Sequence, residues 1–209
     1  MITTTNFQKT LADETSILHQ VAEHAGFNEV LFGGRATREK YGKYLLHKYH
    51  IYNELESAMN KFAKDEPLSH FIFPDLIRKE LISKDLNQFL DNNWKESDML
   101  STVSSYVYRI RQIARENPAL LIAHAYVHYF ADLAGGLILK GILENQYNYS
   151  DNELNAYKFN KIENVHEFMK NYLNLMDYMV EELHVEDEFI EETKLAYVYS
   201  ISALVELAA

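Results

Sequence analysis

The sequence contains no cysteine, and this absence removes several kinds of chemistry at once. Disulfide bonds, thiolate zinc sites, cysteine-ligated iron–sulfur clusters and a cysteine nucleophile are all excluded. Helix breakers are also scarce, with 7 glycines and 3 prolines among 209 residues. Alternating apolar and polar runs bounded by turn residues, which are typical of strands, are missing as well. We therefore expect an all-α fold.

Positive charge is in short supply, since 20 lysines and arginines face 31 aspartates and glutamates, a formal net charge of −11. This balance argues against nucleic acid or an anionic membrane surface as a general partner. No stretch approaches the roughly 18 apolar residues of a membrane span, and the first residues lack the apolar core of a signal peptide. We expect a cytoplasmic, monomeric protein that does not associate with membranes.

Apolar residues recur at helical spacing along most of the chain, and the segments 7–24, 38–62, 71–90, 98–116, 118–141, 163–184 and 186–207 are predicted to be helical. Thr37 and Ser97 are the predicted N-caps of the second and fourth of these segments. No shift in composition marks a domain boundary. Residues 1–209 are therefore predicted to form one multi-helix bundle.

Two adjacent glycines interrupt the apolar segment ALLIAHAYVHYFADLAGGLILKG, residues 119–141. Each costs roughly 1 kcal/mol relative to alanine inside a helix, so the pair needs a reason. One reason is close helix packing or a simple kink. The other is a backbone that must approach a flat ligand, which any Cβ would obstruct. Asp132 lies one turn before the pair and needs water or hydrogen-bond partners if it is buried.

A second feature lies in the first predicted helix, where Thr15, His19 and Glu23 follow one another at intervals of four residues. This spacing puts them along one side of the helix. Glu23 can then accept from one imidazole nitrogen and leave the other for a metal. A single histidine on a helix is more often a surface residue or a hydrogen-bonded core residue.

Taken together, these motifs resemble the heme oxygenase family. The residues that carry the resemblance are T-x-x-x-H-x-x-A-E at 15–23, YHIYNELE at 49–56 and ADLAGG at 131–136, and the similarity extends to TKLAYVYSISALVEL at 193–207. It implies a single-domain, multi-helix bundle in which heme lies between a proximal helix and a kinked distal helix.

The resemblance implies that His19 ligates the heme iron as a neutral imidazole, with Glu23 near its other nitrogen. Gly135 and Gly136 would let the distal helix bend and lie against the porphyrin. Ala131 stands where the family motif has its first glycine, and it adds a methyl group beside the heme.

The remaining expected site residues surround the ring. By resemblance, Asp132 holds a water chain that delivers a proton, and Tyr52 belongs to the same network. Lys170 would pair with a heme propionate and Tyr126 would contact a propionate. Tyr197 would pack on the macrocycle.

The implied reaction is oxidative cleavage of heme to biliverdin, carbon monoxide and ferrous iron, with dioxygen as oxidant. No flavin or nicotinamide fingerprint is present, so electrons are expected from a ferredoxin or an NAD(P)H-dependent reductase.

Two other readings stay open. One is a heme-binding or heme-sensing protein whose turnover has been lost through Ala131. The other is a non-heme di-iron oxidase. It would use His124, His128 and Asp132 together with the Glu-x-x-His pairs at 163–166 and 181–184.

Overall fold

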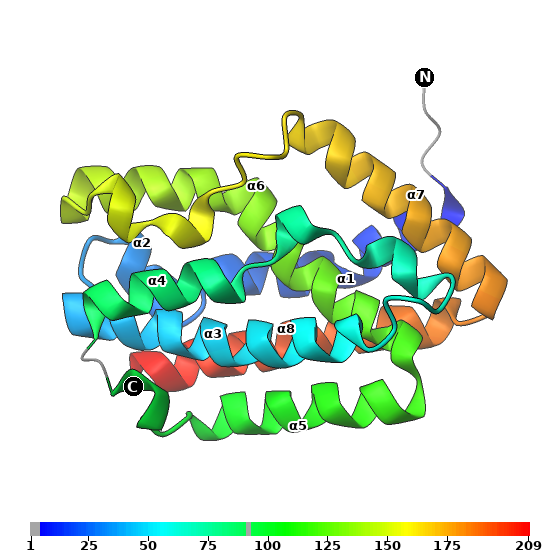
Figure 1. Cartoon of the computed structure of the whole chain (residues 1–209), viewed down its shortest axis with the longest axis horizontal. Coiled ribbons are helices and arrows are strands. Elements are labelled where there is room, and N and C mark those ends of the chain that lie inside the picture. Colours follow the sequence, from blue (N-terminus) through cyan, green and yellow to red (C-terminus); the bar gives the residue numbers. More distant parts are fainter. Residues whose placement is uncertain (1–4, 91–92) are drawn as a thin grey trace.

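The computed structural model describes residues 5–90 and 93–209, and this part of the chain consists of helices joined by turns (Figure 1). The α-helices are α1 (Asn6–His24), α2 (Phe27–Phe32), α3 (Arg38–Asn60), α4 (Lys79–Phe89), α5 (Ser101–Glu116), α6 (Leu121–Tyr147), α7 (Val165–Leu183) and α8 (Glu186–Ala208). Short 3₁₀ helices cover Leu68–Phe71, Pro74–Leu76, Trp94–Glu96, Pro118–Leu120, Asp151–Glu153 and Asn155–Tyr157. Since no strand occurs in these ranges, the all-α prediction is confirmed.

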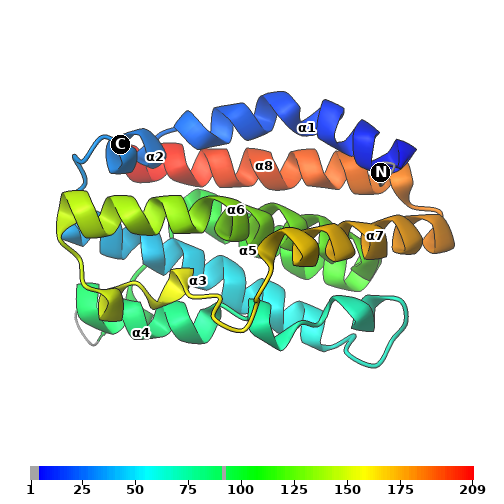
Figure 2. The same cartoon turned by 90° about the horizontal axis from the view of Figure 1, so that it is seen from above.

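The C-terminal helix α8 lies at the centre of the arrangement. It packs against α1 on one side and against α6 and α5 on others, and Figure 2 shows it running between α1 and α6. The helix α3 packs against α4 and α5 and completes the main core. No helix in the described residues is long and apolar enough to cross a membrane.

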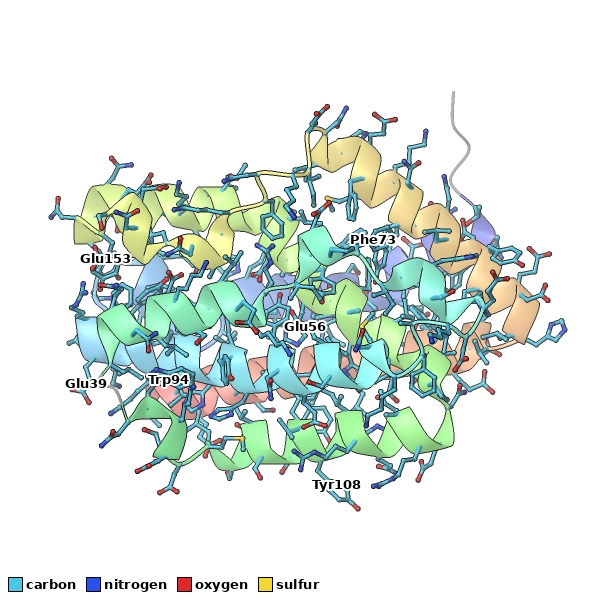
Figure 3. The ribbon with its side chains drawn as sticks, viewed as in Figure 1. Glu39, Glu56, Phe73, Trp94, Tyr108 and Glu153 are labelled. Carbon is cyan, nitrogen blue, oxygen red and sulfur yellow. The ribbon has the colours of Figure 1, made fainter. Side chains whose placement is uncertain are left out.

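Helical periodicity decides which side chains enter this core. In α5, Val103, Tyr106, Ile110 and Ile113 recur at intervals of three and four residues, and all are buried. Tyr108 lies off that stripe and is 64% exposed, and Figure 3 shows it pointing away from the bundle. An apolar stripe of this kind on one face is what positions a helix in a bundle.

The two predicted N-caps had different outcomes. Thr37 caps α3, because its side-chain oxygen accepts from the backbone N–H of Lys40 at 3.1 Å. The prediction for Ser97 was wrong, because α5 begins at Ser101. There the Glu206 carboxylate on α8 accepts from the backbone N–H groups of Ser101 at 3.1 Å and Thr102 at 2.9 Å. A cap supplied by a residue so distant in the chain leaves no local signal.

The glycine pair does not end the helix that contains it. The helix α6 runs from Leu121 to Tyr147 through Gly135 and Gly136, and Figure 1 shows that it changes direction along its length. The predicted kink is thus a bend within one continuous helix.

Gly26, between α1 and α2, is the glycine that the fold requires most strongly. Its φ is +51°, a value that side chains disfavour. An ideal Cβ there would lie 2.3 Å from the backbone oxygen of Leu204 on α8. The turn after α1 therefore touches the α8 backbone directly, and this contact fixes where α1 lies along α8.

We expect Gly26→Ala to lower the free energy of unfolding by clearly more than the ~1 kcal/mol of an ordinary glycine substitution, because backbone atoms cannot move aside cheaply. Chemical denaturation would measure the change. Gly141→Ala is the control, since a Cβ there meets nothing within 4 Å and alanine favours the helix. Equal effects of the two substitutions would show that the close contact at Leu204 is not a constraint.

Candidate functional site

The candidate site lies between α1 and α6. Both helices pack along α8 but make little direct contact with each other. Where α8 separates them, a small apolar cluster forms apart from the main core; it consists of Leu18 and Ala22 of α1, Tyr126 and Val127 of α6, and Ala196 and Tyr197 of α8. We call the region bounded by α1, α6 and this cluster the slot.

His19 lies on α1 beside the slot. Its side chain is 57% exposed, and its ring makes an edge contact with the Tyr197 ring at 6.1 Å between centroids. Glu23 Oε1 is 3.7 Å from His19 Nδ1, which is longer than a hydrogen bond but close enough to attract an N–H there. The other nitrogen, Nε2, makes no hydrogen bond within the described residues, so it can serve as a metal ligand. Thr15 turns inward and bonds the backbone oxygen of Leu11 instead.

The opposite wall of the slot is one face of α6. Ala131, Ala134 and Ile138 are exposed on this face, with Gly135 among them. A Cβ built on Gly135 meets no atom within 4 Å, whereas one on Gly136 would lie 3.4 Å from the Tyr157 ring. The two glycines therefore have different surroundings, since Gly136 packs against protein and Gly135 faces open space. An exposed apolar stripe interrupted by bare backbone suits a flat apolar molecule.

Asp132 is buried beside this face. The Tyr52 hydroxyl donates to Asp132 Oδ2 at 2.6 Å, and Lys48 Nζ donates to Oδ1. Burial, and after it the charge of Asp132, raises the pKa of Tyr52 well above its usual value. The phenol therefore stays protonated and acts as the hydrogen-bond donor to Asp132. The structure thus brings together the two residues predicted to share a network, and it adds a lysine that sequence reasoning did not identify.

A second buried network runs from α5 through α8 to α6. Arg109 Nε donates to Glu192 at 3.0 Å. Although burial acts to raise it, hydrogen bonds from His124 and Arg109 lower the pKa of Glu192 to about 2. Burial lowers the pKa of His124 and lowers that of His128 to about 3, so both rings are neutral. Tyr106 lies between the two histidines.

This network has a defined direction. The Glu192 carboxylate only accepts, so the single N–H of neutral His124 is on Nε2, 2.8 Å away. His124 Nδ1 then accepts from the Tyr106 hydroxyl at 2.9 Å, and the Tyr106 oxygen accepts from His128 Nε2 at 3.0 Å. His124 and His128 are therefore committed to hydrogen bonds.

The residues predicted to contact the propionates and the macrocycle come from α6, α7 and α8. Tyr197 is nearly buried in the cluster between α1 and α6, where burial raises its pKa. Tyr126 is half-buried next to it, with its ring 4.7 Å from that of Phe130. Lys170 is half-buried on α7, which contacts both α1 and α6, and it forms no ion pair within residues 5–90 and 93–209.

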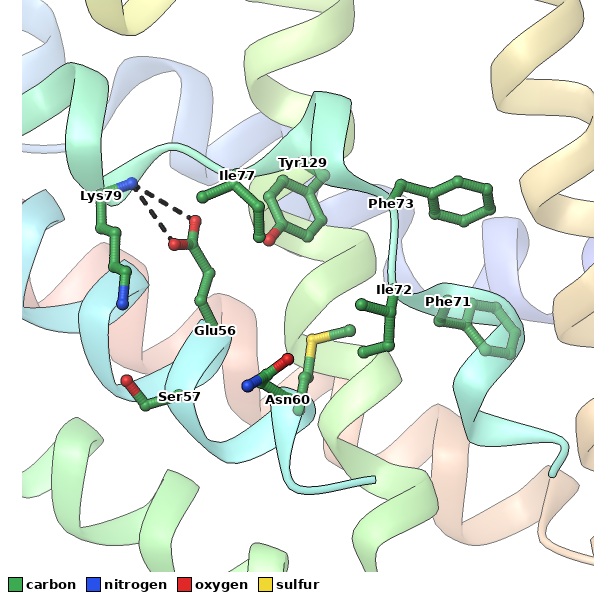
Figure 4. A pocket seen from close by; sticks show the side chains of 10 residues that line it. Glu56, Ser57, Asn60, Phe71, Ile72, Phe73, Ile77, Lys79 and Tyr129 are labelled. Atoms are coloured by element: carbon green, nitrogen blue, oxygen red, sulfur yellow. Dashed lines mark hydrogen bonds between the residues drawn. The ribbon is translucent and has the colours of Figure 1, made fainter. Parts of the chain in front are cut away.

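A cavity of about 360 Å³ lies elsewhere, between the end of α3 and the segment 71–79 (Figure 4). Its lining includes Tyr129 and Glu56, and the Glu56 carboxylate accepts from the backbone N–H groups of Arg78 and Lys79. Burial raises the pKa of Glu56 to about 7. None of the predicted site residues lines this cavity, whereas Tyr126 and Tyr197 belong to the cluster that bounds the slot, so we take the slot as the candidate site.

The arrangement does not suit a di-iron centre. In the described part of the chain no group of three or more histidine, aspartate or glutamate side chains is placed to hold a metal ion. His124 already uses both nitrogens, and the Glu-x-x-His pairs at 163–166 and 181–184 are exposed.

Comparison with known proteins agrees with the geometry. The family model described as Heme oxygenase matches residues 5–206. The protein named Heme oxygenase 1 from the cyanobacterium Synechocystis is 33% identical, over 97% of this chain and 85% of its own length. The crystal structure of heme oxygenase-1 from Synechocystis in complex with heme matches with a TM-score of 0.89 and 31% identity, covering 97% of this chain and 92% of that chain. The structure of heme oxygenase from Leptospira interrogans matches with a TM-score of 0.88 and 26% identity, covering 97% of this chain and 100% of that chain. With matches along nearly its whole length, the chain belongs to the heme oxygenase family.

Proposed function

We propose that the slot between α1 and α6 binds heme and that the chain opens it to biliverdin, carbon monoxide and ferrous iron, with dioxygen as oxidant. The observation that carries this proposal is the open space over Gly135 on α6, together with the exposed imidazole of His19 on α1. A flat ring fits between an imidazole and bare backbone, and a bulkier residue at 135 would fill the space that the ring needs. The bound heme supplies the iron and the macrocycle at which the oxygen chemistry takes place.

His19 is the proposed iron ligand. The nearby Glu23 carboxylate favours an N–H on Nδ1, which leaves Nε2 as the lone-pair donor. The slot floor of Tyr197 and Ala196 gives the ring an apolar surface on the side of His19. Lys170 and Tyr126 are proposed to contact the propionates at the edge.

Asp132 and Tyr52 are the proposed proton-handling pair on the opposite side. Tyr52 holds one carboxylate oxygen, and the lone pairs that remain on Asp132 can hold a water in the slot. Ala131 and Gly135 lie on the same exposed face, one turn apart. Because the Tyr52–Asp132 pair is intact behind that face, we favour turnover over heme binding alone.

The electrons are proposed to come from a separate ferredoxin or NAD(P)H-dependent reductase, since the sequence has no nicotinamide or flavin fingerprint. We further propose that the chain works as a cytoplasmic monomer formed by one domain, residues 1–209. Residues 1–4 and 91–92 of this range lie outside the described residues.

His19→Ala is expected to shift the absorption spectrum of added hemin and to reduce biliverdin formation strongly, because the iron loses its imidazole. Absorption spectra and biliverdin yield with a chemical reductant would measure both. His24→Ala is the matched control, since His24 is exposed on the same helix and its ring nitrogen Nδ1 is hydrogen-bonded to the backbone oxygen of Gln20. If the spectrum and yield of His19→Ala equal those of His24→Ala, the ligand assignment is wrong.

Gly135→Leu is expected to preserve folding but to weaken hemin binding, because its side chain enters space that is open in the protein. In a helix interior leucine should even raise the free energy of unfolding, by up to about 1 kcal/mol. Gly141→Leu provides the comparison, since a Cβ there is equally free on another face of α6. Tight hemin binding by Gly135→Leu would place the ligand elsewhere.

Asp132→Asn is expected to retain hemin binding and to lose most biliverdin formation, since an amide cannot carry the carboxylate's charge. It should also leave Lys48 buried without a counter-charge, at a cost of about 3 kcal/mol in the free energy of unfolding. The assay therefore compares biliverdin per bound hemin, which corrects for unfolded protein. Full biliverdin yield per bound hemin would exclude Asp132 from proton handling.

A further inference from the structure

Lys48 on α3 is a lysine inside the bundle, with only 13% of its side chain exposed. Its Nζ lies 5.7 Å from the ring centroids of each of three tyrosines, Tyr44, Tyr52 and Tyr157. Its ion-pair partner is Asp132, through Oδ1. The ammonium group is thus enclosed by aromatic rings and faces one carboxylate.

An enclosed lysine of this kind needs compensation for lost hydration. Burial is the largest influence on Lys48 and acts to lower its pKa, but the charge of Asp132, the neighbouring Tyr44 and the hydrogen bond to Asp132 together outweigh it and the pKa is raised. The electron-rich ring faces add a weaker attraction. Lys48 therefore stays charged, and the pair that it forms with Asp132 has no net charge.

The lysine and Tyr52 hold Asp132 from the same neighbouring helix. They lie four residues apart on α3, so both reach α6 from one face. Lys48 binds Oδ1 and Tyr52 binds Oδ2, so each carboxylate oxygen has its own donor. Two donors on separate oxygens fix the plane of the carboxylate as well as its position.

The tyrosine enclosure also contacts the second glycine of the pair. Tyr157 lies against Gly136, where an added Cβ would be 3.4 Å from its ring. The Tyr157 hydroxyl is within 3.2 Å of that of Tyr41, which holds the ring in place. Gly136 thus lies against the ring that encloses Lys48, at a distance that an added Cβ would still meet as ordinary van der Waals contact, while Gly135 faces open space.

We propose that Lys48 is a positioning residue for heme cleavage: its ammonium keeps Asp132 ionised and fixes the carboxylate so that it accepts hydrogen bonds from water in the slot. This inference rests on the proposed role of Asp132. It assigns the carboxylate the role of an anchor for the proton-delivering water, since an ionised Asp132 has no proton of its own to give.

The first test uses the chain without heme and reads the charge of Asp132 directly. In Lys48→Met the buried carboxylate loses its cationic partner, so the protonated form is favoured. We expect a C=O absorption of a protonated carboxyl in the infrared spectrum at neutral pH, shifted by ¹³C-aspartate labelling and removed when Asp132→Asn is added. The ¹³C-aspartate label separates this band from the carboxyl band of Glu56, which the label does not shift. A band from Asp85 would be the same in every variant, so it disappears when spectra of the variants are subtracted.

The second test measures biliverdin per bound hemin. We expect the biliverdin yield to fall several-fold in Lys48→Met and to recover in Lys48→Arg, which keeps the charge. Adding Lys48→Met to Asp132→Asn should lower the yield little further, because both substitutions act through the same carboxylate. Lys43→Met is the matched control, since Lys43 lies on the same helix in an exposed pair with Glu39. If Lys48→Met does not fold, Lys48→Gln takes its place, because it keeps a donor and removes the charge.

The proposal is overturned if Lys48→Met shows no new carboxyl band, or if the band forms without a fall in yield relative to Lys43→Met. A failure of the unaltered chain to form biliverdin would instead refute the proposed function. The infrared result without heme would still decide whether Lys48 controls the charge of Asp132.

Discussion

The packing of α1 and α6 on α8, with little contact between them, is the constraint on which the rest of the site depends. Helices with apolar faces normally close on each other, and here α8 separates them and provides the floor between them. Gly26 fixes one end of this arrangement, because its backbone touches that of Leu204. The Cβ position of Gly135 on α6 meets no atom within 4 Å, and the His19 side chain on α1 is more than half exposed, so both helices keep an uncovered position for the proposed ligand.

The buried charges on the α6 side each serve to join helices. Asp132 on α6 is held by Lys48 and Tyr52 from α3, and Glu192 on α8 joins His124 of α6 to Arg109 of α5. Breaking such a pair leaves an uncompensated charge in the interior, which costs several kcal/mol. The polar groups behind the slot are therefore held more tightly than its open face.

The sequence predicted the helical class and most helix positions, because helical periodicity carries local information. The meeting of Tyr52 with Asp132 joins two distant segments, and it was expected only from the resemblance to the heme oxygenase family. It did not reveal that Glu206 caps α5, since that contact joins segments far apart in the chain. Lys48 did leave a signal, because it lies four residues from both Tyr44 and Tyr52 within an apolar stripe. A charge on such a stripe indicates a buried partner, but only the fold identifies it as Asp132.

The two walls of the slot differ in a way that suits their proposed tasks. His19 is more than half exposed on α1, and a heme seated beside it would bury the ring and complete its surroundings. Asp132 and Tyr52 are buried and hydrogen-bonded by groups of the protein itself. Proton delivery requires groups fixed before the reaction begins, because reorganising them would add to the barrier. Metal ligation tolerates adjustment, since the bond itself orients the imidazole as it forms.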